Sequence, residues 1–294
     1  ITVRALTGLN TILEKERPDI VLVHGDTTTT FVAALAAFYR QIRVGHVEAG
    51  LRTGSKYSPF PEEMNRRMAG AIADYHFAPT FQARANLTAE GVDPARILVT
   101  GNTVIDALAA VVQDKFVFDN PVLDGINYQK NRVLVVTTHR RENLGEPLQN
   151  VYHALRFVVE NYHDVQVVFP VHRNPLVQGA ADSILGGLGR INLIDPLEYA
   201  PFVNLMNNSY MVLTDSGGLQ EEAPSLGKPV LVLRDTTERP EAVAAGTVKM
   251  VGTGQEEIIR ACRVLLEDKE EYNKMAAAVN PYGDGRASGR IASG

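Results

Sequence analysis

Residues 211–226 read MVLTDSGGLQEEAPSL, and this stretch decides the class of fold. Its first four residues are apolar or β-branched, which favours a buried strand, and Ser-Gly-Gly then leads into a segment of helical character. A strand followed by glycines and a helix start presents free backbone N–H groups and the positive end of the helix, an arrangement that suits a phosphate. The stretch therefore predicts a strand–loop–helix unit of an α/β protein, with an anion cradle after the strand.

The same rhythm extends along the rest of the chain. Short runs rich in Val, Ile and Leu alternate with longer segments of helical period. Hydrophobicity in these runs is continuous rather than alternating, which is typical of parallel strands covered by helices on both faces. The predicted strands are residues 19–23, 43–47, 75–78, 96–100, 132–137, 166–171, 191–194, 211–214 and 229–233. We expect an α/β protein of doubly wound parallel sheets.

The chain of 294 residues, 45% of them apolar and 21% charged, has room for about two globular domains. Residues 116–130 interrupt every pattern with Asp, Asn, Pro and Gly before a strong new strand begins, so we predict domains at 1–118 and 119–294. The first domain opens with a helix at residues 5–15, where a doubly wound domain normally opens with a strand, and its start is expected before Ile1. Residues 283–294 are expected to be a mobile tail or the approach to a helix.

Composition argues against several classes of partner. With 29 Lys and Arg against 34 Asp and Glu, the net charge is −5, so nucleic acid is not an expected partner and an anionic ligand must be held by local groups. The single cysteine, Cys262, excludes a disulfide framework and a thiolate metal cage, and it fits a reducing compartment such as the cytoplasm. No apolar run approaches the ~20 residues of a membrane span, and no signal-peptide pattern follows Ile1.

Two familiar phosphate signatures do not match. Gly227-Lys228 is followed by Pro229 and lacks the upstream glycine of a Walker A loop. Gly252 and Gly254 form no strand–GxGxxG–helix unit. Neither ATP hydrolysis nor nicotinamide binding is supported, and we expect no metal and no cofactor.

Three carboxylates follow predicted strands or begin a helix in the first domain. Ligands of open parallel sheets bind beyond the carboxyl ends of the strands, where Asp26 and Glu48 lie, and Glu62 is in the first turn of a helix that starts at Pro61. Together they are candidates for acid–base catalysis. Two structural alternatives remain open, because Asp26 also suits a helix N-cap and Glu62 also suits the first turn of any helix.

Cationic residues mark the corresponding strand ends of the second domain. His139, followed by Arg140 and Arg141, suits a diphosphate whose charge grows as it departs, and His172 has the same position after the next strand as a weaker candidate. A lone histidine is more often structural.

The loop Ser216, Gly217 and Gly218 forms the predicted anion cradle, and Glu222, one turn into its helix, could accept hydrogen bonds from ribose hydroxyls. The alternative is that the glycines only allow a tight turn and that Glu222 complements the helix dipole.

Together these motifs resemble the non-hydrolysing UDP-N-acetylglucosamine 2-epimerase family. The resemblance rests on HGDTTTT at 24–30, GHVEAGLRT at 45–53, PEEMNR at 61–66, TGNTVID at 100–106, HRREN at 139–143 and LTDSGGLQEE at 213–222. It continues through LGKPV at 226–230 and DTTERPE at 235–241, and so covers nearly the whole chain. The family's first strand, and a loop with an Arg and a Lys that reach the substrate, would precede Ile1.

The resemblance implies a GT-B-like architecture of two Rossmann-like domains with the active site in the interdomain cleft. It also implies a cytoplasmic homodimer that reversibly epimerises UDP-N-acetylglucosamine at C2, by elimination of UDP to 2-acetamidoglucal and re-addition, for cell-envelope polysaccharide. Family roles carried onto this sequence make Asp26, Glu48, Glu62 and His139 catalytic and make Arg66, Arg140, Leu197, Phe202, Ser216, Gly217, Gly218, Glu222 and Arg239 substrate-binding. A second UDP-N-acetylglucosamine is expected as an activator, with Arg140 and His172 as contributors.

Three rival functions remain on this sequence. A glycosyltransferase of the same fold is disfavoured by three acids in place of one base and an open acceptor groove. A hydrolysing epimerase would release the sugar from its nucleotide. A nucleotide-sugar-binding protein without turnover is the alternative outside the enzymes.

Overall fold

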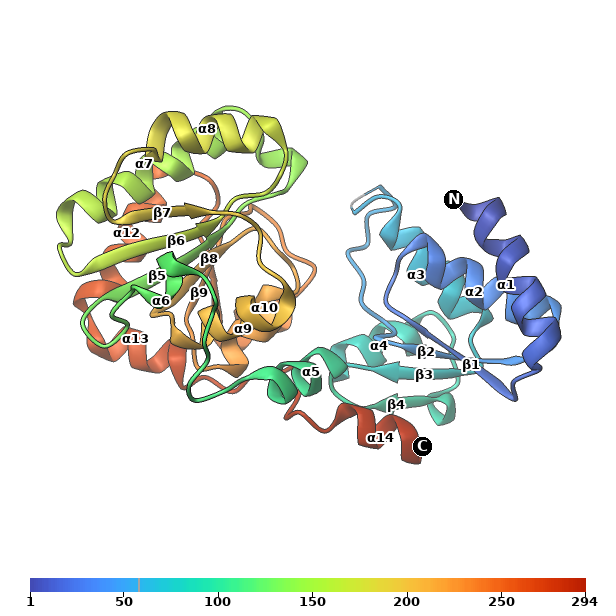
Figure 1. Ribbon diagram of the computed structural model, residues 1–294. Helices are drawn as coiled ribbons and strands as arrows, with labels where there is room; N and C mark the ends of the chain where they lie inside the picture. The colour runs from blue at the N-terminus through green and yellow to red at the C-terminus, as the bar shows by residue number, and fades with distance from the viewer. Residues whose placement is uncertain (58) are drawn as a thin grey trace. The chain divides into compact units, whose positions relative to one another are not determined.

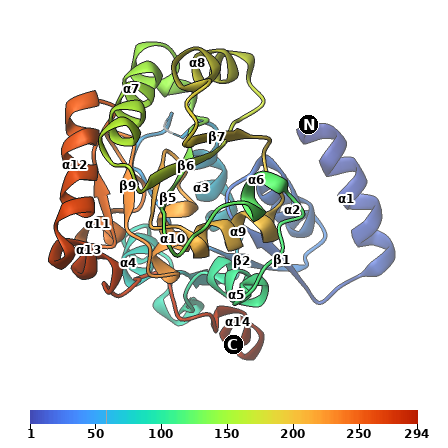
Figure 2. The same cartoon turned by 60° about the vertical axis from the view of Figure 1, so that its left-hand side comes forward.

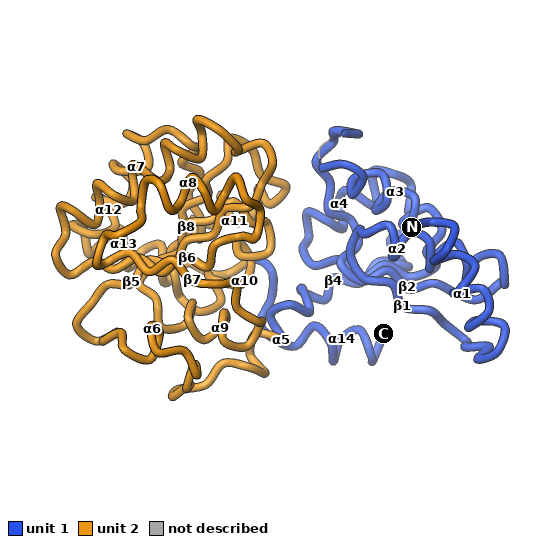
Figure 3. The backbone as a smooth tube through the Cα atoms, turned by 45° about the horizontal axis from the view of Figure 1, so that its top comes forward, with its two compact units in different colours: residues 1–106, 281–294 blue, residues 107–280 orange. Residues whose placement is uncertain are grey.

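The computed structural model describes residues 1–57 and 59–294 and divides into two compact units. Unit 1 comprises residues 1–106 and 281–294, and unit 2 comprises residues 107–280 (Figure 3). The domain boundary expected at 118/119 differs from this division in two places. The change of unit falls within helix α5 (Thr103–Val111), and residues 281–294 return to unit 1.

Hydrogen bonds on either side of the change of unit explain its position. The side chain of Asn204 accepts from the backbone N–H of Gln113 at 2.9 Å and donates to the carbonyl of Val111 at 2.9 Å, which ties the end of α5 to unit 2. On the other side, the carboxylate of Asp106 accepts from the backbone N–H groups of Ala287 and Ser288 at 3.0 and 2.8 Å. Neither long-range tie is visible as a sequence pattern.

Unit 1 contains one parallel sheet in the order β1-β2-β3-β4, with residues paired in register from Ile20↔Arg43 to His24↔Val47 in its first pair. Its strands are β1 (Ile20–His24), β2 (Arg43–Val47), β3 (Tyr75–Ala78) and β4 (Ile97–Val99). Its helices, besides the start of α5, are α1 (Thr2–Glu16), α2 (Thr28–Tyr39), α3 (Glu62–Ile72), α4 (Phe81–Ala89) and α14 (Ala287–Ser293), with a 3₁₀ turn η1 (Pro94–Arg96).

Local chemistry sets the helix starts of unit 1. The hydroxyl of Thr27 accepts the backbone N–H of Thr30 at 3.3 Å, and that of Thr80 accepts the backbone N–H of Ala83 at 3.0 Å. Each threonine therefore satisfies one of the N–H groups that a helix leaves unpaired at its start. Because α2 is rich in alanine, it packs closely against the sheet through Ala34, Ala36 and Ala37.

Unit 2 contains a six-stranded parallel sheet in the order β10-β9-β8-β5-β6-β7. Figure 1 labels β5 to β9 of this sheet. Its strands are β5 (Arg132–Thr137), β6 (Val165–Pro170), β7 (Ile191–Ile194), β8 (Met211–Thr214), β9 (Val230–Val232) and β10 (Val248–Met250). Its helices are α6 (Pro121–Asp124), α7 (Glu146–Asn161), α8 (Pro175–Leu185), α9 (Tyr199–Asn208), α10 (Leu219–Ser225), α11 (Pro240–Ala245), α12 (Gln255–Glu267) and α13 (Lys269–Ala276), with a 3₁₀ turn η2 (Arg141–Asn143).

The strand order reverses between β5 and β8. The chain proceeds outward from β5 to β6 and β7 on one side, and from β8 to β9 and β10 on the other. Crossover connections leave this point on opposite faces of the sheet, which opens a crevice beyond the carboxyl ends of the two central strands. Residues 138–143 and 215–218 therefore lie where a ligand of this fold is expected.

The core of unit 2 explains why β5 reads as a continuous apolar run. Val133, Leu134, Val135 and Val136 are all fully buried because helices cover both faces of the sheet. Leu134 and Val136 belong to the cluster that includes apolar side chains of α7, α8 and α12, helices that Figure 2 shows along one side of unit 2.

All the predicted strands are present, each overlapping its predicted range. One further strand, β10, was not among those predicted; it has three residues, and Lys249 within it is exposed. The expected parallel α/β class is confirmed, since every strand pair in the described residues is parallel. Within the described part of the chain, no helix has the length and apolar character that a bilayer span requires.

We predict that Asp106→Ala frays α14. The substitution removes the acceptor of two N–H groups in the first turn of a short helix, which costs about 1 kcal/mol for a typical cap. Amide hydrogen exchange of residues 287–293 should accelerate about fivefold relative to the wild type. Asp114, an exposed residue three positions beyond the end of α5, is the matched control. Equal exchange in Asp106→Ala and Asp114→Ala would refute the capping role.

Candidate active site

Asp26 is fixed by helix α3 although it lies in the loop after β1. Arg66 donates from Nη2 to Oδ2 of Asp26 at 2.7 Å, and Asn65 donates from its side-chain amide to the backbone carbonyl of Asp26 at 2.9 Å. Arg66 is buried, whereas 31% of the Asp26 side chain remains exposed. The carboxylate is thus oriented from inside the protein and open to a ligand from outside.

Glu48 lies at the end of the neighbouring strand β2 in a left-handed backbone conformation, with φ of 64°. Asn102, beyond the end of β4, donates from its side-chain amide to Oε1 of Glu48 at 3.2 Å, and Nε2 of His24 is 3.6 Å from Oε2. A Cβ on Gly25 would lie 3.2 Å from the same Oε2, so the glycine leaves room for this carboxylate. The ends of three strands therefore contribute to one polar edge.

Glu62 is the first residue of α3 and is partly exposed, and among the described residues its carboxylate has no hydrogen bond or ion pair. Its neighbour Glu63 is fully buried. Glu63 accepts from Nε of Arg67 at 3.1 Å and from the backbone N–H of Thr53 at 3.1 Å, and it lies 3.5 Å from Nη1 of Arg66. The two acids that the sequence presents as one pair thus differ, since only Glu63 is a structural anchor.

His46 supports the turn before Asp26. It is buried in β2, and its Nε2 lies 2.8 Å from the carbonyl oxygen of Gly25. Burial lowers its pKa to about 4, so the imidazole is neutral near pH 7 and donates from Nε2 to that carbonyl. This contact therefore fixes the turn that precedes Asp26.

The central group of unit 2 is Asp215, which the sequence analysis did not include among the site residues. It follows β8, is fully buried, and accepts from the backbone N–H groups of His139 and Arg140, each at 2.9 Å. Nδ1 of His139 lies 2.9 Å from Oδ1, and Asn143 donates from its side-chain amide to Oδ2 at 3.1 Å. An Asp directly before Ser-Gly-Gly was the available sequence signal.

Asp215 is held as a carboxylate by these donors. Burial by itself raises its pKa, but the hydrogen bonds from the His139 side chain and from backbone N–H groups outweigh burial and hold the pKa below the usual range. Since Nδ1 of His139 faces Asp215, Nε2 is the ring atom left for a ligand, and 41% of the side chain is exposed. The ring centroid of His172 lies 6.2 Å from that of His139.

The glycine loop after β8 packs against an arginine. A Cβ on Gly217 would lie 2.5 Å from Nη1 of Arg239 and 2.6 Å from Oε1 of Glu238, so any side chain at this position would displace that ion pair. Nε of Arg239 donates to Oε1 of Glu221 at 2.5 Å. The loop and the arginine that the sequence predicted as ligand-binding are therefore neighbours.

Glu222 is buried in α10 and accepts a hydrogen bond from the Tyr199 hydroxyl at 2.9 Å. Burial raises its pKa to about 7, so both protonation states are accessible near neutral pH. Of the predicted apolar contacts, Leu197 lies in the loop after β7 and Phe202 in α9, both partly buried and within five residues of Tyr199 in sequence.

Three arginines converge on one buried carboxylate beside this loop. Glu238 accepts from Nη1 of Arg234 at 2.9 Å and from Nη1 of Arg239 at 2.8 Å, and Nη2 of Arg140 lies 3.6 Å away. Burial opposes ionisation of Glu238, but the arginines outweigh it and lower its pKa to about 2. Two acids, Glu238 and Glu221, thus fix the orientation of these arginines.

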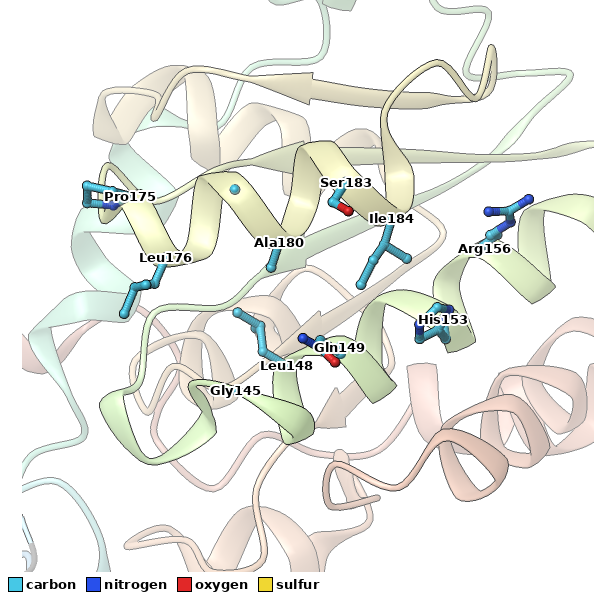
Figure 4. Close-up of a pocket in the computed structure, with 11 residues that line it drawn as sticks. Gly145, Leu148, Gln149, His153, Arg156, Pro175, Leu176, Ala180, Ser183 and Ile184 are labelled. Carbon is cyan, nitrogen blue, oxygen red and sulfur yellow. The ribbon is translucent and has the colours of Figure 1, made fainter.

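A groove of about 750 Å³ lies elsewhere in unit 2, between α7 and α8 (Figure 4). Leu148, Leu176 and Ile184 line it with polar groups such as His153, and none of the predicted site residues does. Because the predicted site residues lie elsewhere, we place the candidate functional residues at the carboxyl edge of each sheet. In the described residues, no group of three or more His, Cys, Asp or Glu side chains is arranged to hold a metal ion.

The fold and its residues define an α/β protein of two parallel-sheet units. Unit 1 has carboxylates at the ends of its strands, and unit 2 has a histidine, arginines and glycines suited to binding phosphate at the ends of its strands. A family model described as UDP-N-acetylglucosamine 2-epimerase matches residues 1–294. The chain belongs to this family of isomerases.

Named relatives agree with the family match. The chain is 59% identical over 291 residues to the UDP-N-acetylglucosamine 2-epimerase of Bacillus subtilis, covering 99% of this chain and 76% of that protein. A solved structure described as an S. aureus MnaA–UDP co-structure matches with a TM-score of 0.95 and 49% identity, covering 99% and 79%. The Neisseria meningitidis UDP-GlcNAc 2-epimerase bound to UDP-GlcNAc matches with a TM-score of 0.93 and 49% identity, covering 99% and 80%. The expected GT-B-like class is confirmed.

We predict that Asp215→Asn destabilises unit 2 by about 3 kcal/mol at pH 7, because an amide presents a donor to groups that are themselves donors. The pKa of Asp215 is depressed in the folded state, so its stabilisation is present above the unfolded value of about 3.9 and lost as pH falls through the folded value. Urea unfolding should therefore show a deficit that shrinks from pH 7 to pH 3. Exposed Asp195, also at a strand end, provides the control Asp195→Asn, and a pH-independent deficit would argue against the ionic role.

A second prediction concerns Glu222→Gln. The folded pKa of Glu222 lies above the unfolded value, so wild-type stability falls as pH rises from about 4.5 to about 7 and the proton is released from a buried site. The amide cannot ionise and still accepts from Tyr199, so at pH 8 the variant should be about 1–3 kcal/mol more stable than the wild type, with little difference at pH 5. Thermal unfolding at both pH values, with Glu198→Gln as the exposed control, checks this. A variant less stable at pH 8 would contradict it.

Proposed function

We propose that this chain reversibly epimerises UDP-N-acetylglucosamine to UDP-N-acetylmannosamine without hydrolysing the nucleotide sugar. Support comes from the family, from relatives of 59% and 53% identity named as this 2-epimerase, and from a related structure bound to UDP-GlcNAc. The observation in this chain that carries the proposal is the Arg66-held carboxylate of Asp26, at the same sheet edge as Glu48.

The chemistry requires a proton to leave C2 and return on the opposite face. Breaking the C1–O bond sends its electron pair to the departing UDP, and loss of the C2 proton to a carboxylate forms the C1=C2 bond of 2-acetamidoglucal. Re-addition of UDP at C1 with protonation at C2 from the other face gives the epimer. Because one acid cannot easily serve both faces, several are needed, and we assign Asp26, Glu48 and Glu62 to these proton transfers and to stabilising the cationic ring.

The residues of unit 2 suit the leaving group. We assign Nε2 of His139 and the loop Ser216, Gly217 and Gly218 to the diphosphate, whose charge grows in the transition state. Glu222 is assigned to the ribose hydroxyls. The uridine and phosphate contacts are assigned to Leu197, Phe202, Arg140 and Arg239. On this proposal unit 1 acts on the sugar and unit 2 binds UDP, in place of the domains 1–118 and 119–294 expected from the sequence.

The family resemblance predicts that Arg66 contacts the substrate directly. We assign it a different role. It is buried, donates to Asp26 at 2.7 Å and lies 3.5 Å from Glu63, which supports a positioning role for the catalytic carboxylate.

The remaining assignments concern regulation and setting. We propose a second UDP-N-acetylglucosamine as an activator, contacted by Arg140 and His172; the 6.2 Å between the rings of His172 and His139 supports a link to the leaving-group residue. A homodimer, a cytoplasmic location and a product used for cell-envelope polysaccharide complete the proposal.

Incubation with UDP-N-acetylglucosamine in deuterated water tests this function. We expect deuterium at C2 of a UDP-linked product, since the carboxylates exchange their proton with solvent. Asp26→Asn should lower deuterium incorporation by about 100-fold or more while leaving UDP affinity within about threefold, because its role lies in proton transfer. Mass spectrometry and UDP titration measure the two quantities.

Exposed Asp114→Asn is the matched control and should behave as wild type. Free N-acetylmannosamine with UDP would indicate a hydrolysing enzyme instead, transfer of the sugar to an added acceptor would indicate a glycosyltransferase, and bound but unexchanged sugar would indicate a binding protein. Equal loss of turnover and UDP affinity in Asp26→Asn would show that Asp26 acts mainly in binding.

A further inference from the structure

A second polar pocket of about 410 Å³ lies at the opposite edge of the unit 2 sheet from His139. It is lined by residues that precede the three adjacent strands β5, β8 and β9, together with Tyr272 of α13. β5 is six residues long, so about 20 Å separates the two edges. A ligand here would not compete for the site at the carboxyl ends of the strands.

Lys228, in the loop before β9, is a partly buried cation of this pocket. Within residues 1–57 and 59–294, no carboxylate lies within 4.0 Å of its ammonium group, and its side chain makes no hydrogen bond. Burial lowers its pKa, with no neighbouring acid to oppose the effect. A charge removed from water without a partner costs free energy, which an anionic ligand would recover.

Further donors around Lys228 are also uncommitted. In the described part of the chain, the side chains of Lys130, Gln129 and Asn207, which line the same pocket, make no hydrogen bond or ion pair. Arg132 contrasts with them, because Asp164 takes its Nε and Nη2 at 2.6 and 2.8 Å. The pocket thus offers the ammonium groups of Lys228 and Lys130 and two side-chain amides to a ligand. The Arg132 guanidinium is instead engaged in the ion pair with Asp164.

Contacts among its own side chains hold the wall of the pocket in place. The rings of Tyr210 and Tyr272 are stacked with centroids 4.2 Å apart, and the Tyr272 hydroxyl donates to the carbonyl of Tyr210 at 2.9 Å. The Arg132 guanidinium lies 5.5 Å from the centroid of the Tyr210 ring. A wall fixed before binding reduces the entropy that a ligand must overcome.

We propose that this pocket binds a small phosphorylated sugar. Lys228 and Lys130 would hold the phosphate, for which lysine is a common point-charge ligand, and the amides of Gln129 and Asn207 would donate to and accept from hydroxyl groups. The volume lies within the range of small-molecule sites. The inference is independent of the proposed epimerase activity.

Titration calorimetry with glucose 6-phosphate, in the presence of saturating UDP, tests the site. Wild-type protein should bind glucose 6-phosphate more tightly than inorganic phosphate, and Lys228→Met should weaken the binding by about tenfold or more. Lys269→Met removes an equally positive but exposed side chain outside the pocket and should bind as wild type does. Lys228→Met should keep wild-type UDP affinity and melt at the same or a higher temperature, since it removes a poorly partnered charge.

Absence of binding up to about 10 mM glucose 6-phosphate would overturn the proposal. Equal affinity in wild type and Lys228→Met would do the same, as would binding of inorganic phosphate as tight as that of the sugar phosphate. Failure of any kind here leaves the deuterium test of the epimerase untouched, because that test reports on residues at the other edges of the sheets.

Discussion

The buried carboxylate of Asp215 is the constraint on which the candidate site of unit 2 depends. A fully buried carboxylate is tolerated only when hydrogen-bond donors surround it. Asp215 meets this condition because the loop after β5 donates backbone N–H groups to it. The loop follows β5, on one side of the strand-order reversal, and Asp215 follows β8, on the other side. The carboxylate of Asp215 therefore joins the two loops that border the crevice. The orientation of His139 is a consequence, because its Nδ1 completes the set of donors.

Unit 1 solves a related problem with a buried cation. Arg66 extends from α3 to Asp26 and Glu63, and the fully buried Glu63 in turn binds the backbone of Thr53. Helix α3 therefore fixes the loop after β1 on one side and the segment after β2 on the other. In both units the exposed, chemically useful side chain is oriented by a partner that solvent does not reach, which preserves its geometry while leaving it accessible.

Charge also separates the two edges of the unit 2 sheet. At the carboxyl edge, Arg234 and Arg239 are paired with Glu238, so this patch of arginines is oriented before any ligand arrives. At the amino edge, Lys228 has no such acid in the described residues. An oriented patch suits precise handling of a reacting group, whereas an unpaired ammonium in a polar pocket suits simple capture of an anion.

The sequence by itself determined the class of fold, the strands and the residues at their ends. Apolar runs such as residues 132–137 are local signals of burial, so the position of Asp26, Glu48, His139 and Ser216 after strands could be predicted without coordinates. Only the tertiary structure showed that Glu63 is fully buried whereas its neighbour Glu62 is not, and that Asp215 contacts the side chain of His139. It also showed that residues 281–294 belong to unit 1. These outcomes depend on which groups distant in sequence approach within hydrogen-bond distance, and burial assigns opposite roles to neighbours that look alike in the sequence.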